Sequence, residues 1–297
     1  MTPLFNLSCR IDPLPLVLYP TVSVAILRLD LVHPVVSGNK WFKLNYYLGE
    51  ATAAGKTILT FGGAYSNHIV ATAAAAKMAG LKSIGVIRGE RAPELSQTLT
   101  EAKAFGMELY FISRKAYQEK TLPDEIANQQ NEFYIIPDGG YGLLGMEGAK
   151  DILLQNQTSA YTHIVSAVGT GTTLAGLAGA AGDDQHVIGI SVLKNNFSLQ
   201  NEVEELVLTC KRKNVRILHD YHFGGYAKYT AELIHFMNDF FRQTSVPTDF
   251  VYTGKAFFGV IDLIQQQFFA PGSKILLVHT GGLQGNRSLA KGTLIFG

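Results

Sequence analysis

The sequence predicts an α/β protein built on open, mostly parallel β-sheets flanked by helices, and three observations support this fold class. First, 47% of the 297 residues are hydrophobic and only 16% are charged, as is typical of sheets covered on both faces. Second, short apolar runs rich in β-branched or aromatic residues recur along the chain. Third, glycine turns and alanine-rich or amphipathic stretches separate several of these runs, in the strand, turn, helix order of parallel folds.

The expected strands are spread over most of the chain. Most of them are continuous apolar runs rather than alternating ones, as strands buried on both faces would be. They comprise residues 57–61, 83–87, 109–112, 133–136, 163–167, 187–192 and 275–279.

Two helices are delimited by their end signals. Asn39 can cap the first, an apolar stripe at helical spacing begins at Trp41, and Gly55 can end it. Lys40 then lies in the first turn of this helix. The second is alanine-rich and runs from about residue 66 to residue 80.

The bulk properties exclude several classes of function. The formal net charge is +1 and the longest basic run is 211–213, so we expect no nucleic-acid partner. Cys9 and Cys210 form no CxxC pattern, which predicts neither a disulfide framework nor a zinc site and fits a reducing cytoplasm. No apolar run approaches the roughly 18 residues that span a bilayer, and no leader pattern is present, so we expect a cytoplasmic protein without a membrane segment. The histidines match no strong metal motif, and no metal is expected.

Two lysines stand at the start of the first helix. Lys40 and Lys43 lie three residues apart, so they share a helix face. A desolvated lysine amine is nucleophilic, and a neighbouring ammonium can bind phosphate and lower its pKa further. The pair could thus bind one anionic, aldehyde-bearing ligand. The alternative is that both lysines decorate an exposed helix start, but lysines there oppose the helix dipole, which mildly favours function.

A glycine turn joins an expected strand to the second helix. Residues 61–68 pass from the strand end through Gly62-Gly63 into Ser66, Asn67 and His68. Such turns lie at the carboxyl edge of a parallel sheet, where ligands bind. The alternative, that Ser66 or Asn67 only caps the helix, stays open at this point.

A second glycine turn has the character of a phosphate-binding loop. Glycines let backbone amides converge on an anion, threonine hydroxyls add donors, and the following helix dipole favours phosphate. No Gly-Lys-Ser/Thr follows, so this is not a Walker loop. A nicotinamide dehydrogenase is one alternative, but strand 187–192 is followed by Leu193-Lys194-Asn195-Asn196 rather than by a ribose-binding acidic residue. A purely structural turn is another. The loop comprises Val168, Gly169, Thr170, Gly171 and Thr172.

Two further junctions combine polar residues with glycine. The first contains Tyr252 and Thr253, and the second contains Thr280. A tyrosine can stack or transfer a proton, and a threonine can hydrogen-bond a ring nitrogen without keeping it protonated. Without the other segments, both junctions would be interpreted as ordinary turns.

Taken together, these segments resemble the D-cysteine desulfhydrase and 1-aminocyclopropane-1-carboxylate deaminase family. The resemblance covers nearly the whole chain, and it is the combination of motifs that is specific. The motifs are Gly38-Asn39-Lys40 with Lys43-Leu44, Gly62-Gly63 with Ser66-Asn67, Gly139-Gly140, the 169–172 loop, Val251-Tyr252-Thr253-Gly254-Lys255-Ala256 and His279-Thr280-Gly281-Gly282.

The resemblance implies a fold type II pyridoxal-phosphate enzyme of the tryptophan-synthase-β type. Residues 1–46 and 149–297 would form a large domain and residues 47–148 a small one, with the cofactor between them. Leu27-Arg28-Leu29-Asp30 looks like the strand that precedes the lysine segment in relatives. A homodimer is also implied.

The resemblance further assigns residues to the cofactor. Lys40 would be the Schiff-base lysine, and Lys43 would join the 168–172 loop at the phosphate. Asn67 would lie near the phenolic oxygen, and Thr253 and Thr280 would belong to the cofactor's surroundings.

The substrate side is assigned in the same way. Lys40, Ser66 and Tyr252 would be catalytic, with Ser66 facing the substrate carboxylate or reacting carbon. The expected substrate-binding residues are Ser66, Asn67, His68, Tyr226 and Tyr252. Tyr65, His68, Asp138 and Tyr141 depart from the residues common in relatives, so they bear on substrate identity.

Thr253 and Thr280 separate the two activities of the family. The deaminases resemble Val-Tyr-Glu-Gly-Lys and His-Leu-Gly-Gly, whereas this chain has threonine at both positions. A glutamate would keep the cofactor ring protonated and strongly electron-withdrawing, and a threonine would make it weaker. The expected reaction is therefore α,β-elimination from a small amino acid, D-cysteine giving pyruvate, ammonia and sulfide. The alternatives are 1-aminocyclopropane-1-carboxylate deamination to 2-oxobutyrate and ammonia, or a catalytically weak binding protein with this fold.

Overall fold

The chain folds into two compact units, each with its own β-sheet, in a computed structural model that describes residues 7–14, 21–208 and 215–296. The smaller unit contains Lys40–Gly148, and the larger unit contains Leu7–Asn39 and Ala149–Gly297. The chain therefore passes from the larger unit into the smaller one between Asn39 and Lys40. Residues 40–46, expected to belong to the large domain, group with the smaller unit.

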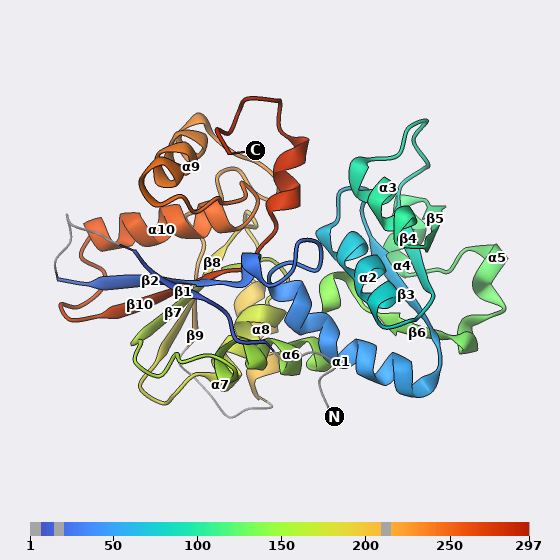
Figure 1. Ribbon diagram of the computed structural model, residues 1–297, viewed down its shortest axis with the longest axis horizontal. Coiled ribbons are helices and arrows are strands. Elements are labelled where there is room, and N and C mark those ends of the chain that lie inside the picture. Colours follow the sequence, from blue (N-terminus) through green and yellow to red (C-terminus); the bar gives the residue numbers. More distant parts are fainter. Residues whose placement is uncertain (1–6, 15–20, 209–214, 297) are drawn as a thin grey trace. The chain divides into compact units, whose positions relative to one another are not determined.

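The smaller unit holds a four-stranded, fully parallel sheet in the order β5-β4-β3-β6 (Figure 1). Its apolar side chains form two clusters, one with α2 and α3 and one with α4 and α5, so the sheet is buried on both faces. All four strands match runs that the sequence predicts. They are β3 (Thr57–Gly62), β4 (Ser83–Arg88), β5 (Met107–Ile112) and β6 (Phe133–Ile136).

The helices of the smaller unit follow the strands in the expected alternation. The helical segments are α1 (Asn39–Ala54), α2 (Asn67–Met78), α3 (Gln97–Ala104), α4 (Arg114–Glu119), α5 (Asp124–Ala127), the 3-10 turns η2 (Gln130–Glu132) and η3 (Asp138–Gly140), and α6 (Leu143–Leu154), whose second half belongs to the larger unit.

The larger unit holds a six-stranded sheet in the order β1-β2-β10-β7-β8-β9, parallel except for β1. Strand β10 pairs with both β2 and β7, so a strand from near the end of the chain lies beside one from near its beginning. The strands are β1 (Ile11–Leu14), β2 (Ser23–Arg28), β7 (His163–Val168), β8 (His186–Ser191), β9 (Val215–Leu218) and β10 (Lys274–His279). The helical segments are η1 (Leu29–Leu31), α7 (Thr172–Ala180), α8 (Leu199–Leu208), α9 (Ala231–Thr244), α10 (Thr253–Gln265) and η4 (Leu283–Ser288).

The prediction of two mostly parallel sheets flanked by helices is confirmed, with three differences in detail. Strands β1 and β9 were not expected, because each has only four residues and lacks a continuous apolar run. The expected strand Leu27–Asp30 is only half right, because β2 ends at Arg28 and the next residues form η1. Cys210 and the basic run 211–213 lie outside the described residues.

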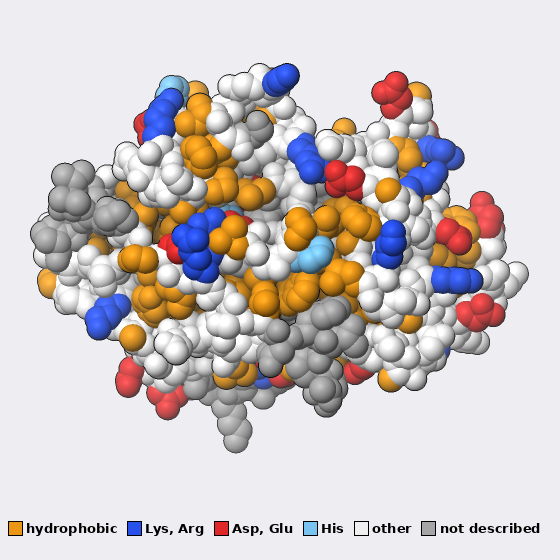
Figure 2. Space-filling model, in the orientation of Figure 1, with side chains coloured by type: hydrophobic (Ala, Val, Ile, Leu, Met, Phe, Trp, Pro, Cys, Tyr) orange, Lys and Arg blue, Asp and Glu red, His pale blue; other side chains and the backbone are white. Residues whose placement is uncertain are grey.

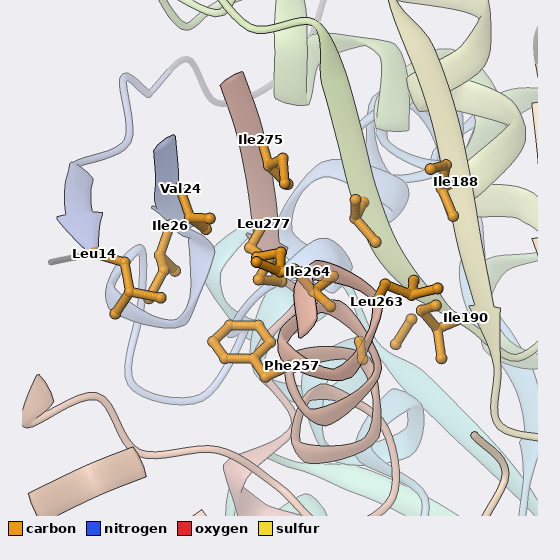
Figure 3. Packing of buried hydrophobic residues seen from close by; sticks show 14 of the residues in the cluster. Leu14, Val24, Ile26, Ile188, Ile190, Phe257, Leu263, Ile264, Ile275 and Leu277 are labelled. Carbon is orange, nitrogen blue, oxygen red and sulfur yellow. The ribbon is translucent and has the colours of Figure 1, made fainter. Parts of the chain in front are cut away.

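Helix α10 covers part of the larger sheet and supplies much of its core. Figure 3 shows Phe257, Leu263 and Ile264 of α10 pointing toward apolar side chains of the strands, including Ile26 of β2 and Leu277 of β10. All five side chains are almost fully buried. Because Tyr252 and Thr253 stand at the N-terminal end of this helix, the same packing fixes both residues in the larger unit.

Helix α1 is held in the smaller unit by its apolar stripe and by α6. The stripe expected from the sequence is buried from Trp41 to Ala51. Gly148 of α6 lies so close that an added Cβ would come within 2.1 Å of the Phe42 carbonyl oxygen. Only glycine permits this approach, and the contact fixes the first turn of α1, which carries Lys40 and Lys43.

Among the described residues, no helix has the length and apolarity needed to cross a membrane. On the face seen in Figure 2, Lys and Arg side chains stand in separate groups rather than in one continuous basic surface.

Candidate active site

The backbone before Lys40 is anchored to the larger unit. Asn39 N–H donates to the Thr280 carbonyl oxygen at 3.2 Å, and Asn39 Nδ2 donates to Thr173 Oγ1 of α7 at 2.8 Å. Gly38 has φ +68° and would bring a Cβ within 1.9 Å of the same Thr280 oxygen. Asn39 therefore ties the start of α1 to the end of β10 and to α7, and glycine is required at position 38.

Lys40 has the electrostatic properties of a nucleophilic amine. Burial lowers the pKa of its amine to about 8, and the charge of Asp138 partly offsets that effect. Lys43 is 2% exposed, and burial followed by the nearby charge of Lys40 holds its pKa well below the usual range. The charge of Lys40 thus lowers the pKa of Lys43, whereas burial lowers the pKa of Lys40. The expected effect of a neighbouring ammonium therefore acts on Lys43 rather than on Lys40. The lowered pKa raises the neutral fraction of Lys40 at pH 7 by roughly two orders of magnitude over that of an ordinary lysine.

His68 lies in the same part of the smaller unit and is held in one tautomer. Thr60 Oγ1 donates to the Ile136 carbonyl oxygen at 2.8 Å, and His68 Nε2 lies 2.8 Å from Thr60 Oγ1. Because the only hydroxyl proton of Thr60 goes to Ile136, His68 must carry its proton on Nε2 and present Nδ1 as an acceptor. That Nδ1 is buried without a hydrogen-bond partner in the described part of the chain. Burial, then the charges of Lys40 and Lys43, keep the pKa of His68 well below its ordinary value.

Ser66 and Asn67 stand at the N-terminus of α2, after the carboxyl end of β3. Ser66 occupies the cap position, but its side chain makes no capping hydrogen bond. The capping alternative for Ser66 is therefore not supported, and its partly buried hydroxyl is available for another role. Asp138 follows the carboxyl end of β6, so the parallel sheet brings these residues to one edge.

The predicted phosphate loop forms the turn between β7 and α7 in the larger unit. Gly171 has φ +79°, and an added Cβ would lie 2.5 Å from Val203 Cγ2 of α8. Thr172 begins α7, and its Oγ1 is buried without a hydrogen-bond partner among the described residues. The loop thus combines an enforced glycine backbone, a helix N-terminus and an unsatisfied hydroxyl, a combination suited to an oxyanion.

Tyr252 lies against this loop. A Cβ at position 169 would come within 3.1 Å of Tyr252 Cε1 and 3.6 Å of its hydroxyl oxygen. The ring of Tyr226 packs edge-on to that of Tyr252, with centroids 6.0 Å apart, and Tyr226 is 54% exposed. The larger unit therefore brings both predicted substrate tyrosines together beside Gly169.

Thr253 is buried, and its hydroxyl is hydrogen-bonded within the protein. Thr253 Oγ1 donates to Asp249 Oδ1 at 2.7 Å and accepts from Asp249 N–H at 2.8 Å. Asp249 also accepts from the amides of Val251, Tyr252 and Thr253. The carboxylate is thus saturated by four donors and fixes the loop before α10. The predicted contact of Thr253 with the cofactor ring stays a prediction, and the threonine proton is already engaged.

Thr280 follows the carboxyl end of β10, in a segment fixed by the hydrogen bonds of a histidine. His279 Nε2 lies 2.7 Å from the Pro247 carbonyl oxygen, and His279 Nδ1 accepts from Gly281 N–H at 3.3 Å. Asp30 Oδ1 lies 3.5 Å from His279 Nδ1, too far for a strong hydrogen bond. Arg28 pairs with Asp30 instead, at 2.7 Å.

Three residues of these networks were not expected from the sequence. Thr60 sets the tautomer of His68, Asp249 holds Thr253, and Tyr117 donates a hydrogen bond to Asp138. A signal exists only for Asp249, which stands three residues before Tyr252, at the spacing at which an acidic side chain accepts from following amides. Thr60 and Tyr117 sit in an apolar strand and in a short helix, where nothing in the sequence sets them apart.

Comparisons with known proteins identify the family of this chain. The chain matches the family described as "Pyridoxal-phosphate dependent enzyme" over residues 10–281. It is 34% identical over 282 residues to a putative 1-aminocyclopropane-1-carboxylate deaminase of Pyrococcus horikoshii, covering 89% of this chain and 85% of the relative. It is 30% identical over 289 residues to the mitochondrial bifunctional D-cysteine desulfhydrase/1-aminocyclopropane-1-carboxylate deaminase of Arabidopsis thaliana, covering 88% and 72%.

A solved structure described as an ACC deaminase homologue superposes with a TM-score of 0.81 at 30% identity, covering 95% of this chain and 91% of the other. The nicotinamide dehydrogenase alternative is therefore wrong. The chain belongs to the pyridoxal-phosphate-dependent enzymes, in the group of relatives named 1-aminocyclopropane-1-carboxylate deaminase and D-cysteine desulfhydrase.

Proposed function

We propose that this enzyme catalyses α,β-elimination from a small D-amino acid, with D-cysteine giving pyruvate, ammonia and sulfide. The observation that favours elimination over deamination is the identity of residue 253. It is an uncharged threonine, hydrogen-bonded to Asp249, at the position where the deaminase motif Val-Tyr-Glu-Gly-Lys has a glutamate. Lys40 binds the cofactor covalently and serves as the base. A homodimer in the cytoplasm belongs to the same proposal, and sedimentation velocity measures the oligomeric state.

The residues present fit pyridoxal phosphate. Thr172 offers a buried hydroxyl without a partner among the described residues, in a loop where only glycine fits at position 171. Lys43 offers a buried amine that forms no ion pair with any described residue. A buried hydroxyl without a hydrogen-bond partner, such as that of Thr172, is costly unless a ligand completes it. We assign the loop and Lys43 to the phosphate, and Lys40 to the aldehyde.

The first chemical role of the protein itself is proton transfer by the Lys40 amine. When bound, pyridoxal phosphate withdraws electrons from the substrate's α-carbon. With a pKa of about 8, Lys40 is partly neutral near pH 7 and can take up the α-proton. Asp138 favours the protonated amine and thereby stabilises the state after this transfer. Ser66, whose hydroxyl does not cap α2, is assigned to the substrate carboxylate.

Tyr252 and Tyr226 are assigned to the substrate side of the cofactor. Tyr252 lies over Gly169 and Tyr226 packs against it, so both rings belong to the unit that carries the phosphate loop. The hydroxyl of Tyr252 can donate a proton to a leaving thiolate. Loss of the thiolate from the β-carbon, with release of ammonia by hydrolysis, gives the three products.

The test of cofactor attachment uses reconstituted protein and does not depend on turnover. Borohydride reduction followed by peptide mass spectrometry should place the phosphopyridoxyl group on Lys40. The Lys40→Ala variant should lose that modification, and Lys43→Ala should keep it while binding the cofactor more weakly. Sulfide and pyruvate release from D-cysteine then tests the reaction. A modification found on Lys43, or equal turnover of L-cysteine and D-cysteine, would overturn the assignment.

A second candidate function is deamination of 1-aminocyclopropane-1-carboxylate to 2-oxobutyrate and ammonia. The names of the relatives favour it, and so does the Ser66 hydroxyl that makes no capping bond, since Ser66 and Tyr252 could assist ring opening. Parallel measurement of pyruvate from D-cysteine and 2-oxobutyrate from the cyclopropane acid separates the two. If the cyclopropane acid has the higher kcat/KM, the second candidate replaces the first.

A further inference from the structure

A basic cavity lies at the carboxyl edge of the smaller sheet. Its volume is about 450 Å³, and five residues line it: Arg88, Arg114, Tyr117, Gln118 and Lys120. Arg88 ends β4, and the other four belong to α4 or directly follow it, after β5. The cavity lies entirely within the smaller unit, and neither the cofactor nor the substrate assignments above use any of its residues.

An aromatic ring organises the cations of this cavity. Lys120 Nζ lies 4.1 Å from the ring centre of Tyr117 and 4.8 Å from that of Phe61. The Arg88 guanidinium carbon lies 5.7 Å from the ring centre of Tyr117. Tyr117 is only 7% exposed, and its hydroxyl donates to Asp138. Cation–π contacts with a buried ring therefore hold two of the three cations beside the cavity.

The positive charge of the cavity is largely uncompensated. Within the described ranges, Arg88 and Arg114 form no ion pair, and Lys120 reaches a carboxylate only at 3.9 Å, that of Asp138. Three cations of like sign gathered on one cavity repel one another unless an anion binds between them. Gln118 adds an uncharged amide donor.

We propose that this cavity binds a small oxyanion, a phosphate or carboxylate group, through Arg88, Arg114 and Lys120. Arginine presents a planar fork of N–H donors that matches both kinds of oxyanion, and lysine adds a point charge. One carboxylate offsets one of the three cations, so the cavity suits a doubly charged group. Gln118 completes the set of donors.

Two sources could supply this oxyanion. One is a free inorganic or metabolite oxyanion. The other is an acidic group at the far end of a substrate, because Arg88 Nη2 lies 3.8 Å from where a Cβ of Gly63 would be. Gly63 belongs to the turn that leads to Ser66, so this arginine adjoins the predicted substrate segment. The second source rests on the proposed function, whereas the first does not.

Isothermal titration calorimetry of the holoenzyme with inorganic phosphate tests the first source without turnover. The matched control for Arg114→Gln is Lys115→Gln, the next residue on α4, which does not line the cavity. The expected result is saturable binding that Arg114→Gln and Arg88→Gln each weaken at least about tenfold, because a charge-assisted hydrogen bond is lost. Lys115→Gln should change the affinity less than about twofold.

Kinetics test the second source. For S-carboxymethyl-D-cysteine, Arg114→Gln should raise KM about tenfold with kcat retained, whereas KM for D-cysteine should stay unchanged. Phosphate binding lost in Arg114→Gln identifies a free oxyanion, and a selective rise in KM identifies the substrate's acidic end. Either outcome supports the site. If Arg114→Gln matches Lys115→Gln in both experiments, the proposal is overturned. An enzyme inactive on every amino acid that still binds phosphate through Arg114 would refute the proposed reaction and leave this site standing.

Discussion

Replacing Gly171 by alanine tests whether the phosphate loop has the backbone described above. Gly171 combines a left-handed backbone, with φ +79°, and close packing, because an added Cβ would lie 2.5 Å from Val203 Cγ2. Gly272 supplies a matched control in the same unit, with φ +84° and no heavy atom within 4 Å of an added Cβ. The two substitutions share the backbone cost and differ only in the steric clash.

The expected losses of unfolding free energy follow from these two terms. The left-handed conformation costs a residue with a Cβ about 1–2 kcal/mol, and this is the whole expected cost of Gly272→Ala. A methyl group forced into a packed contact adds about 1–3 kcal/mol. Gly171→Ala should therefore lose about 2–5 kcal/mol. Combining it with Val203→Ala should recover part of the clash, giving a favourable coupling of about 1–2 kcal/mol.

Urea unfolding followed by circular dichroism measures these stabilities, and a titration of the apoprotein with pyridoxal phosphate measures cofactor affinity. Gly171→Ala should weaken the cofactor, since the loop amides must shift, whereas Gly272→Ala should leave its affinity unchanged. Equal destabilisation by the two substitutions, or absence of coupling with Val203→Ala, would refute the loop geometry.

Four further outcomes are expected. Reaction of the Lys40 amine with pyridoxal should rise with pH and reach half its maximum near pH 8, because only the neutral amine reacts. Asp138→Asn should move that midpoint to lower pH, since the aspartate charge favours the protonated amine; an upward move in stopped-flow traces would contradict this. Asp249→Ala should lower the free energy of unfolding by roughly 3–5 kcal/mol in urea titrations, because three buried donors and one partly buried donor lose their acceptor; a loss below about 1 kcal/mol would show that water replaces the carboxylate. Tyr252→Phe keeps the ring over Gly169, so cofactor affinity should hold while kcat falls about 10²–10⁴-fold; an unchanged kcat would limit the tyrosine to packing.

Much of the fold was readable from the sequence because its signals are local. The buried parallel strands are mostly apolar, and helix α1 carries both its end signals and its apolar stripe in one short segment. Strands β1 and β9 were missed because Asp12 and Pro13 interrupt the apolar residues of β1 and Arg216 interrupts those of β9. Their pairing comes from the neighbouring strands, and a single segment carries no information about it.

The candidate site divides in the same way. The sequence singled out Lys40 and Lys43 because they share a helix face at a spacing of three, and the family resemblance selected Lys40 as the covalent residue. Burial lowers the pKa of Lys40, and Asp138, which is distant along the chain, partly offsets that effect. The tautomer of His68 depends on which acceptor receives the hydroxyl proton of Thr60. Such properties arise only once separate segments meet, so no local pattern predicts them.

The central position of β10 has a consequence for synthesis on the ribosome. Strand β10 separates β2 from β7 in the larger sheet, yet it is the last strand to be made. The smaller sheet comes from one continuous stretch and can form while translation continues, whereas β2 and β7 keep open edges until residue 279 emerges. The hydrogen bond from Asn39 to Thr280 likewise cannot form until Thr280 has been synthesised. A nascent chain halted before β10 should therefore contain a folded smaller unit and two unpaired, aggregation-prone strand edges. Until β10 is made, it should depend on chaperones.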